Sequence, residues 1–231
     1  MQAAPRLPTA NHLLAALTRA ARGRLLAGVE PVELVYGQIL YEPGALMRHV
    51  YFPLDCLVSL LTTVDAHQAL EVGMIGREGM VGTSLALGIR HSPLRALVQG
   101  SGMALRVGTS RFAAELKVNP ALLRALLGYT HSLLVQVTQT AACNRFHEVD
   151  ARLARWLLMT ADRLQAEEFL LTQEFLAQML GVRRVGVTEA AGVLERRRII
   201  DYSRGHIHIL DRRGLEAAAC SCYRIAGAMA A

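Results

Sequence analysis

The stretch that decides the fold is Leu170–Asp211, with the sequence LLTQEFLAQMLGVRRVGVTEAAGVLERRRIIDYSRGHIHILD. It predicts a helix that Thr172 caps, that runs to Leu180 and that Gly181 ends, because glycine adopts the left-handed cap conformation without cost. The apolar face of this helix recurs at helical spacing: Phe175, Leu176, Met179 and Leu180. A second helix is predicted from about residue 183 to residue 197, with these inward positions: Val187, Ala190, Ala191 and Leu194. Two short helices that meet at a glycine turn form a helix-turn-helix.

The residues after the second helix predict a small hairpin around the turn Ser203-Arg204-Gly205. Ile207 and Ile209 alternate with His206 and His208, as a strand with one solvated face requires. A helix-turn-helix followed by such a hairpin is a winged helix, whose second helix enters the major groove of DNA by its amino end. The polar side chains near that end are Arg183, Arg184, Thr188 and Glu189. Arg204 at the tip of the wing is a candidate phosphate contact.

The charge of this region points to an anionic partner. Residues 183–213 hold eight arginines against four carboxylates, a net charge of +4. The whole chain carries a formal charge of +6, and 24 of its 25 basic residues are arginine, but this global excess alone does not establish nucleic-acid binding. A winged helix that only contacts other proteins is the alternative, and it would need no such local excess. We therefore predict binding to double-stranded DNA.

Residues 32–107 predict an antiparallel barrel or sandwich, because short runs rich in Val, Ile, Leu and Tyr alternate with turns of Gly, Pro and Asp. The predicted strands are residues 34–41, 50–52, 57–64, 70–75, 96–99 and 103–107. One helical turn is predicted within residues 80–87, and one or two short amphipathic helices are predicted within residues 12–26.

A long helix is predicted to start at Asn119-Pro120, because proline at the first helical position costs no hydrogen bond. Its apolar track advances by alternating steps of four and three residues: Leu123, Leu127, Thr130, Leu134, Val137 and Ala141. This is the spacing of a coiled-coil seam and predicts a homodimer, while a helix packed only on its own domain is the alternative. A further helix is predicted at residues 148–166, with Trp156 on its apolar side. Its arginines are expected on the other side: Arg152, Arg155 and Arg163.

The composition excludes several classes of protein. With 231 residues and 52% hydrophobic residues, the chain can bury one large core or two modest ones, and global disorder is excluded. No apolar run approaches the roughly 18 residues that a membrane span needs, and the first twenty residues do not resemble a secretory signal. Four cysteines make no disulfide framework. We therefore expect a cytoplasmic protein without a membrane partner.

These features together resemble the Crp–Fnr family of transcription regulators, over residues 12–215. Beside Leu170–Asp211, the resemblance rests on Asn119-Pro120 and Gln136-Val137-Thr138 in the long helix, and on Tyr36–Gly44 and Val50-Tyr51-Phe52 in the β region. It implies an α+β chain with an antiparallel, jelly-roll-like β-roll sensor domain (residues 12–118), a dimerisation helix (residues 119–146) and a C-terminal winged helix-turn-helix (residues 147–231). It also implies a homodimer on a near-palindromic DNA site, with RNA polymerase as a protein partner.

The resemblance assigns roles on the DNA side. Arg184 falls on the family's base-reading arginine, which grips a guanine through two hydrogen bonds. Thr172 and Glu174 fall on positions that contact the DNA backbone. Val185 and Glu189 stand where many members carry an acidic base reader and a second arginine, so the family's usual DNA sequence preference does not carry over to this chain.

The resemblance also defines a candidate effector pocket. Cyclic-nucleotide binders of this family hold the ribose with a glutamate and the phosphate with an arginine; here Thr83 stands at the glutamate position and Leu94 at the arginine position. We therefore expect no cyclic AMP binding of ordinary strength, and the effector is unknown. A β-roll filled by its own side chains is the alternative to an altered pocket. The candidate effector residues are Gly82, Thr83, Arg95 and Thr138.

No metal centre is expected. Residues 1–55 contain no cysteine, so the amino-terminal cysteine cluster of the family's iron–sulfur sensors is missing. Cys220 and Cys222 form the only close pair, and two thiols cannot complete a four-ligand site. His206 and His208 could add ligands only if the tail folded back on the wing, and small residues in an alanine-rich tail are the simpler explanation.

The rival functions are an enzyme that uses the β-roll pocket and a regulator that acts through protein partners. No nucleophile–base pairing, P-loop or metal triad occurs in the sequence. Asp65, His67 and Glu71 lie close together, but in a predicted hairpin loop where a solvated turn explains them. We therefore expect no enzymatic activity.

Overall fold

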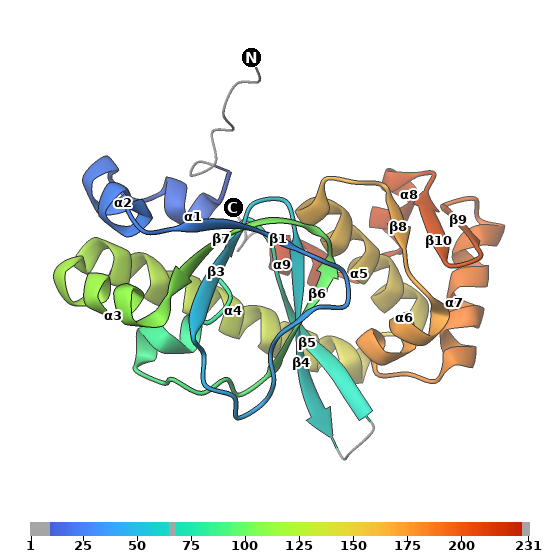
Figure 1. Ribbon diagram of the computed structural model, residues 1–231. Helices are drawn as coiled ribbons and strands as arrows, with labels where there is room; N and C mark the ends of the chain where they lie inside the picture. Colours follow the sequence, from blue (N-terminus) through green and yellow to red (C-terminus); the bar gives the residue numbers. More distant parts are fainter. Residues whose placement is uncertain (1–9, 65–67, 228–231) are drawn as a thin grey trace. The chain divides into compact units, whose positions relative to one another are not determined.

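The computed structural model describes residues 10–64 and 68–227, which form two compact units. The first unit comprises Met1–Leu60 with Met74–Leu134, and the second comprises Leu61–Gly73 with Val135–Ala231. The mixture of helices with antiparallel sheets confirms the predicted α+β class (Figure 1). Of the predicted loop residues, Asp65 and His67 lie outside the described part of the chain.

The β strands of the roll form two sheets, with the orders β1-β7-β3 and β2-β6-β4-β5. In the first sheet the strands pair antiparallel, with Glu30 opposite Arg106 and Val50 opposite Val107. Their inward side chains, such as Phe52 and Leu105, are at most 1% exposed and form the core. The strands are β1 (Glu30–Leu34), β2 (Ile39–Tyr41), β3 (His49–Pro53), β4 (Leu57–Val64), β5 (Gln68–Ile75), β6 (Arg95–Gly100) and β7 (Gly102–Gly108).

The prediction of one strand over residues 34–41 was wrong, because the chain turns between β1 and β2. Gly37 has a φ of +81°, a left-handed conformation that interrupts a strand. The Gln38 amide donates to the carbonyl of Val35 at 3.0 Å and closes the turn. The apolar run across residues 34–41 therefore concealed a break that only the glycine signals.

Helices flank these strands: α1 (His12–Ala15), α2 (Arg19–Leu26), the 3-10 helix η2 (Thr83–Leu87) and α3 (Thr109–Val118). The long helix α4 (Pro120–Phe146) begins at the predicted proline, and Asn119 caps it by accepting a hydrogen bond from the Leu122 amide at 3.1 Å. Leu122 and Leu126 on α4 are fully buried, whereas Leu127 is 45% and Leu134 is 60% exposed. The apolar residues of α4 thus fall into a buried set and an exposed set.

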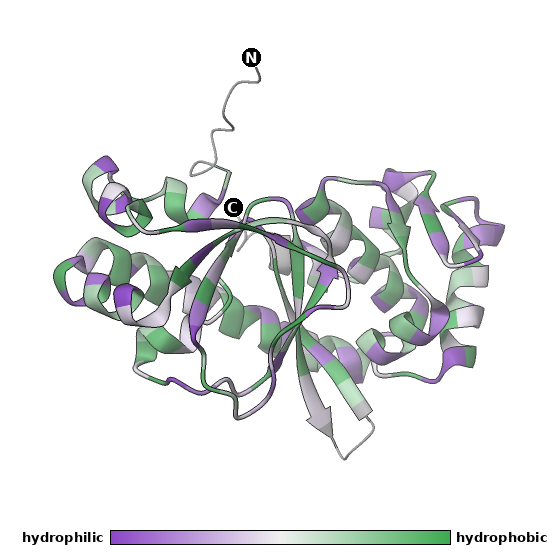
Figure 2. Ribbon diagram, in the orientation of Figure 1, coloured by the Kyte–Doolittle hydropathy of each residue, from purple (hydrophilic) through white to green (hydrophobic). Residues whose placement is uncertain are grey.

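The second unit is built around α5 (Val149–Leu164), which packs against four other helices of the unit. Those helices are α6 (Gln173–Leu180), α7 (Arg184–Arg196), α8 (Arg212–Ala218) and α9 (Cys222–Gly227). A small antiparallel sheet of order β8-β10-β9 completes the unit, from β8 (Glu168–Leu170), β9 (Ile200–Ser203) and β10 (His206–Ile209). Hydrophobic and hydrophilic residues alternate along these helices, as expected where one side is buried (Figure 2).

The predicted division of α5 into an apolar side and an arginine side was wrong, because the arginines are buried as well. Arg152, Arg155 and Arg163 are only 6–7% exposed. The cause is that α5 is covered on several sides, by α7 as well as by α8 and α9. Arg152 donates to the carbonyl of Leu180, which satisfies an unpaired carbonyl at the end of α6.

None of the helices in residues 10–64 and 68–227 combines the length and the apolar character that a membrane span requires.

Candidate nucleic-acid interface

The first helix of the helix-turn-helix has the predicted start and end. The Thr172 hydroxyl accepts a hydrogen bond from the Phe175 amide at 3.1 Å, so Thr172 is the cap of α6. Gly181 ends the helix in the left-handed region with a φ of +62°. The predicted apolar face is buried except for Phe175, which is half-buried with its ring 6.5 Å from that of Trp156.

The second helix, α7, begins at Arg184, one residue later than predicted, with Arg183 in an extended conformation before it. Its four predicted inward residues are all buried: Val187, Ala190, Ala191 and Leu194. Five residues at its amino end are exposed: Arg183, Arg184, Val185, Thr188 and Glu189. Packing thus fixes the rotation of α7 about its axis and leaves the predicted base-reading positions exposed to solvent.

Gln173 links the two helices and was missed in the sequence. Its Oε1 accepts hydrogen bonds from Arg184 Nε at 3.3 Å and from the Thr188 hydroxyl at 3.0 Å. The contact orients the Arg184 guanidinium from the first turn of α6. The signal available in the sequence was its position directly after the capping threonine, where a long polar side chain reaches the neighbouring helix.

The wing turns through two residues with positive φ, +50° at Arg204 and +83° at Gly205. Such a pair suits a type I′ hairpin, and it projects the Arg204 side chain at the tip. Ile207 and Ile209 are 1% and 3% exposed, while His206 and His208, which alternate with them, are exposed, as predicted. The third strand β8, which pairs with β10, was not predicted, because it is only three residues long.

A hollow with a volume of about 520 Å³ lies where α6, α7 and the wing meet. Four of the predicted DNA contacts line it: Thr172, Glu174, Arg184 and Arg204. Gln173, Tyr202 and Gly205 complete the lining. Arg183, Val185, Thr188 and Glu189 are exposed on the helix but are not part of this lining. The first turn of α6, the start of α7 and the wing tip therefore face one hollow.

Tyr202 and Arg212 are polar residues of the second unit that stabilise its fold. Burial raises the pKa of Tyr202, although the charge of nearby Arg184 opposes the shift, and its hydroxyl donates to the carbonyl of Leu171 at 2.8 Å. Tyr202 is therefore a neutral donor that fixes the wing. Arg212 is paired with Asp162 at 2.6 Å and with Glu216 at 3.1 Å, so it belongs to the packing of α8. Arg212 is therefore not a free cation for a DNA contact, although it is one of the eight arginines counted over residues 183–213.

The β-roll contains a cavity of about 100 Å³, whose lining includes Gly82, Thr83 and Leu94. Two of the four predicted effector residues thus come together. Arg95 does not line this cavity, because its Nε pairs with Glu42 Oε2 at 2.9 Å. Thr138 lies on the part of α4 that belongs to the second unit. Ligand pockets usually measure about 300–1,000 Å³, so this cavity is small for a nucleotide.

We predict that 1 mM cyclic AMP leaves the melting temperature of the protein unchanged, because the phosphate-binding arginine position holds Leu94 and the cavity is about 100 Å³. A bound ligand would raise stability by about 4 kcal/mol at a thousandfold excess over its Kd. Differential scanning fluorimetry and calorimetry check this. Micromolar affinity in the calorimeter would contradict it.

Two groups outside the helix-turn-helix differ from expectation. Glu71 is not in a solvated turn: it lies on β5, is 6% exposed and accepts a hydrogen bond from Trp156 Nε1 at 2.8 Å. The tail cysteines are not isolated either, because Cys143 and His147 lie beside Cys220 and Cys222. His206 and His208 remain exposed on the wing. The sequence could not pair these cysteines with Cys143, since 77 residues separate it from Cys220.

The interface so defined is that of a winged helix-turn-helix, and the comparisons agree with this class. The family model of the Crp-like helix-turn-helix domain matches residues 151–218. The search of curated protein sequences found no match. The second unit therefore contains a Crp-like helix-turn-helix domain.

Solved structures match over most of the chain. FixK2 from Bradyrhizobium japonicum has a TM-score of 0.70 at 15% identity, over 84% of this chain and 98% of its own. A CRP/FNR-family transcriptional regulator from Thermus thermophilus has a TM-score of 0.69 at 22% identity, over 82% and 98%. The c-di-GMP-responsive global regulator CLP from Xanthomonas campestris has a TM-score of 0.68 at 16% identity, over 83% and 99%. The chain thus has the fold of these regulators, as the sequence resemblance implied.

Proposed function

We propose that the protein is a sequence-specific, homodimeric DNA-binding regulator whose signal is something other than ordinary cyclic AMP. The observation that carries this proposal is the hollow shared by α6, α7 and the wing, where Arg184 and Arg204 face the same side. A cation at the start of the recognition helix and another at the wing tip match a major groove and its flanking phosphates. The Crp-like helix-turn-helix domain over residues 151–218 supports a regulator rather than an enzyme.

Each interface residue receives a role from its chemistry. Arg184 reads a guanine through its forked guanidinium, and Arg204 neutralises a phosphate. Thr172 contacts the backbone at the start of α6, and we add Gln173, whose amide can donate to a phosphate oxygen. Glu174 cannot donate when ionised, so we assign it to the edge of the contact. Val185 and Glu189 face the groove beside Arg184, and their chemistry sets a base preference of their own.

The exposed side of α4 supports the proposed dimer. Leu127 and Leu134 are seven residues apart and are 45% and 60% exposed, which is unfavourable for a helix in water. Seven-residue spacing places both on the seam of a two-stranded coiled coil. The remaining seam residues are Leu123, Thr130, Val137 and Ala141. Ala141 is exposed, and the other three are half-buried. A second copy of the chain would cover this side and place two recognition helices on the half-sites of a near-palindrome.

The wider setting follows from this role. A regulator of this type works in the cytoplasm, where DNA is present, and we infer RNA polymerase as its protein partner. The effector acts in the β-roll, and the populations of DNA-competent and incompetent dimers shift with it.

The test is binding to labelled DNA duplexes of random sequence. Fluorescence anisotropy measures the affinity at increasing salt concentrations. We expect binding at low salt that weakens steeply, because cations on the interface release counterions from the phosphates. The variant R204E should bind more weakly and with a shallower salt dependence than the wild type. A protein that binds no duplex at low salt would contradict the proposed function.

A further inference from the structure

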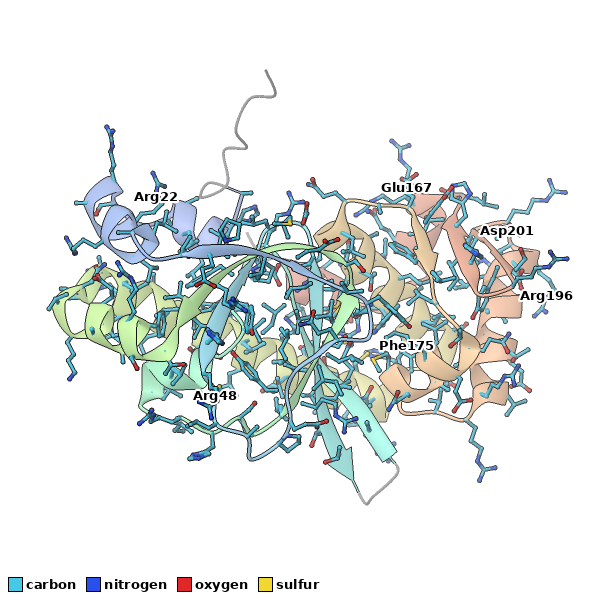
Figure 3. All side chains as sticks on the ribbon, in the orientation of Figure 1. Arg22, Arg48, Glu167, Phe175, Arg196 and Asp201 are labelled. Carbon is cyan, nitrogen blue, oxygen red and sulfur yellow. The ribbon has the colours of Figure 1, made fainter. Side chains whose placement is uncertain are left out.

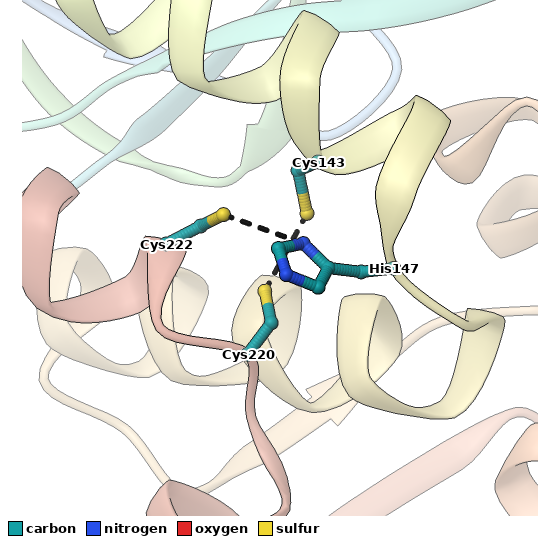
Figure 4. A group of neighbouring side chains, drawn as sticks. All are labelled: Cys143, His147, Cys220 and Cys222. Carbon is teal, nitrogen blue, oxygen red and sulfur yellow. Dashed lines mark hydrogen bonds between the residues drawn. The ribbon is translucent and has the colours of Figure 1, made fainter.

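Four potential metal ligands gather in the second unit, away from the DNA-facing hollow. Cys143 lies in the last turn of α4 and His147 directly follows that helix, while Cys220 lies between α8 and α9 and Cys222 begins α9 (Figure 4). All of their ligand atoms lie within 4.8 Å of one another. The sulfur atoms of Cys143 and Cys220 are 3.5 Å apart, and the Cys222 sulfur is 3.5 Å from Nδ1 of His147.

Local structure holds these four residues in place. Cys143 and His147 are separated by one helical turn, and the His147 amide still donates to the carbonyl of Cys143 at 3.1 Å, so both side chains leave one face of the helix. The tail turns at Cys220, where the Tyr223 amide donates to its carbonyl at 3.1 Å. Tyr223 in turn donates to Asp162 on α5 at 2.8 Å, which anchors the tail independently of the cysteines.

The surroundings of the cluster suit a metal with bound thiolates. Cys143 and Cys222 are fully buried and Cys220 is 8% exposed. The Nε2 of Gln139 donates to the Cys222 sulfur at 2.9 Å, the kind of outer contact that orients a ligand. The free cysteines form no disulfide.

Arg155 supplies the strongest argument from charge. The residue is 6% exposed, and its Nε and Nη1 have no hydrogen-bond partner within the described part of the chain. Its positive charge acts on both Cys143 and Cys220. A buried cation without a counter-charge is costly. Three thiolates and one histidine on a divalent metal carry a net charge of −1, which Arg155 would balance.

We propose that Cys143, His147, Cys220 and Cys222 form a Cys₃His zinc site. Zinc favours four ligands of this kind in a tetrahedron, and zinc–sulfur bonds of about 2.3 Å place the sulfurs roughly 3.8 Å apart. The observed separation of 3.5 Å between the sulfurs of Cys143 and Cys220 is close to that value. An iron–sulfur cluster would set several atoms between the thiolates and would need a wider space. Binding releases the protons of the three thiols to solvent and leaves their sulfurs as ligands to Zn²⁺.

The site goes beyond the proposed DNA binding, because none of its ligands lines the hollow of α6, α7 and the wing. Its role is to fasten the tail with α9 to the end of α4 within the second unit. A full ligand set, with no position left for water, is typical of structural rather than catalytic zinc.

The test begins with the metal content of the full chain, purified under reducing conditions, supplied with Zn²⁺ and desalted. Elemental analysis should find one zinc per chain in the wild type. C143S and C222S should each retain at least about tenfold less zinc, since losing even an outer partner of a ligand costs about 10–100-fold in affinity. C56A is the matched control, because Cys56 is an equally buried thiol in the first unit, and it should keep its zinc.

A second measurement needs no variant and so does not depend on whether the variants fold. Co²⁺ added to the reduced, metal-free wild type should give the strong visible bands of tetrahedral cobalt and thiolate-to-cobalt charge transfer, and Zn²⁺ should displace them. Absence of these bands would overturn the proposal, as would iron with acid-labile sulfide in place of zinc. DNA binding measured on the same samples keeps the two proposals separate, since failure of zinc binding leaves the proposed regulator intact.

Discussion

Replacing Arg184 with alanine is expected to weaken binding to the specific DNA site by about 5- to 150-fold for each half-site, the equivalent of 1–3 kcal/mol. The reason is geometric. Arg184 is exposed in the first turn of α7, and Gln173 holds its Nε at 3.3 Å, so its guanidinium is oriented before DNA arrives. Little side-chain entropy remains to be lost on binding. Titration of labelled site and of a scrambled duplex measures the effect.

The matched control is R196A, which removes the same charge from the other end of the same helix. Arg196 is exposed and points away from the unit (Figure 3). The R196A variant should lower the affinity for both duplexes only slightly. R184A should instead lose affinity for the specific site much more than for the scrambled one. Equal effects of the two variants on the specific site would show that α7 does not read bases through its amino end.

The double variant L127E/L134E is expected to be a monomer and to lose at least about 100-fold in affinity for the full DNA site. Two acidic side chains would face each other across the proposed seam. Because each residue is about half exposed, the chain itself should still fold. The affinity falls because two half-sites bound by one dimer gain roughly 10²–10⁴ over one. Sedimentation velocity gives the mass and anisotropy gives the affinity.

A121E serves as the control for added charge, because Ala121 is exposed on α4 but lies off the seam. It should remain dimeric with unchanged affinity. Circular dichroism of the double variant should match that of the wild type. A double variant that stays dimeric would place the dimer contact elsewhere, and a wild type that is monomeric at micromolar concentration would contradict the dimer altogether.

The winged helix-turn-helix could be predicted because its determinants are local. The cap at Thr172, the stop at Gly181 and the alternation at Ile207 and Ile209 each depend on a few neighbouring residues, and all three are present in the structure. The pair Asn119-Pro120, another local signal, also gave the start of α4 at Pro120. Local signals therefore predicted the elements and the faces that carry the proposed DNA contacts.

What could not be predicted depends on contacts between distant residues. The burial of Arg152, Arg155 and Arg163 was not predicted, because it comes from the packing of α7, α8 and α9 against α5. The pairing of Arg95 with Glu42 spans 53 residues, and Arg95 is not among the residues that line the β-roll cavity. The four-ligand cluster joins Cys143 to a tail 77 residues away, so counting nearby ligands predicted no metal.

The most direct test of the proposed function is selection of duplexes from a random pool by the full-length protein, followed by sequencing. We predict enrichment of an inverted repeat whose half-sites are about one helical turn apart, centre to centre, as two recognition helices of a dimer require. The same selection with R184A should lose the base preference at one position of each half-site. Failure to enrich any inverted repeat, in a preparation that is folded and dimeric, would contradict a sequence-specific regulator.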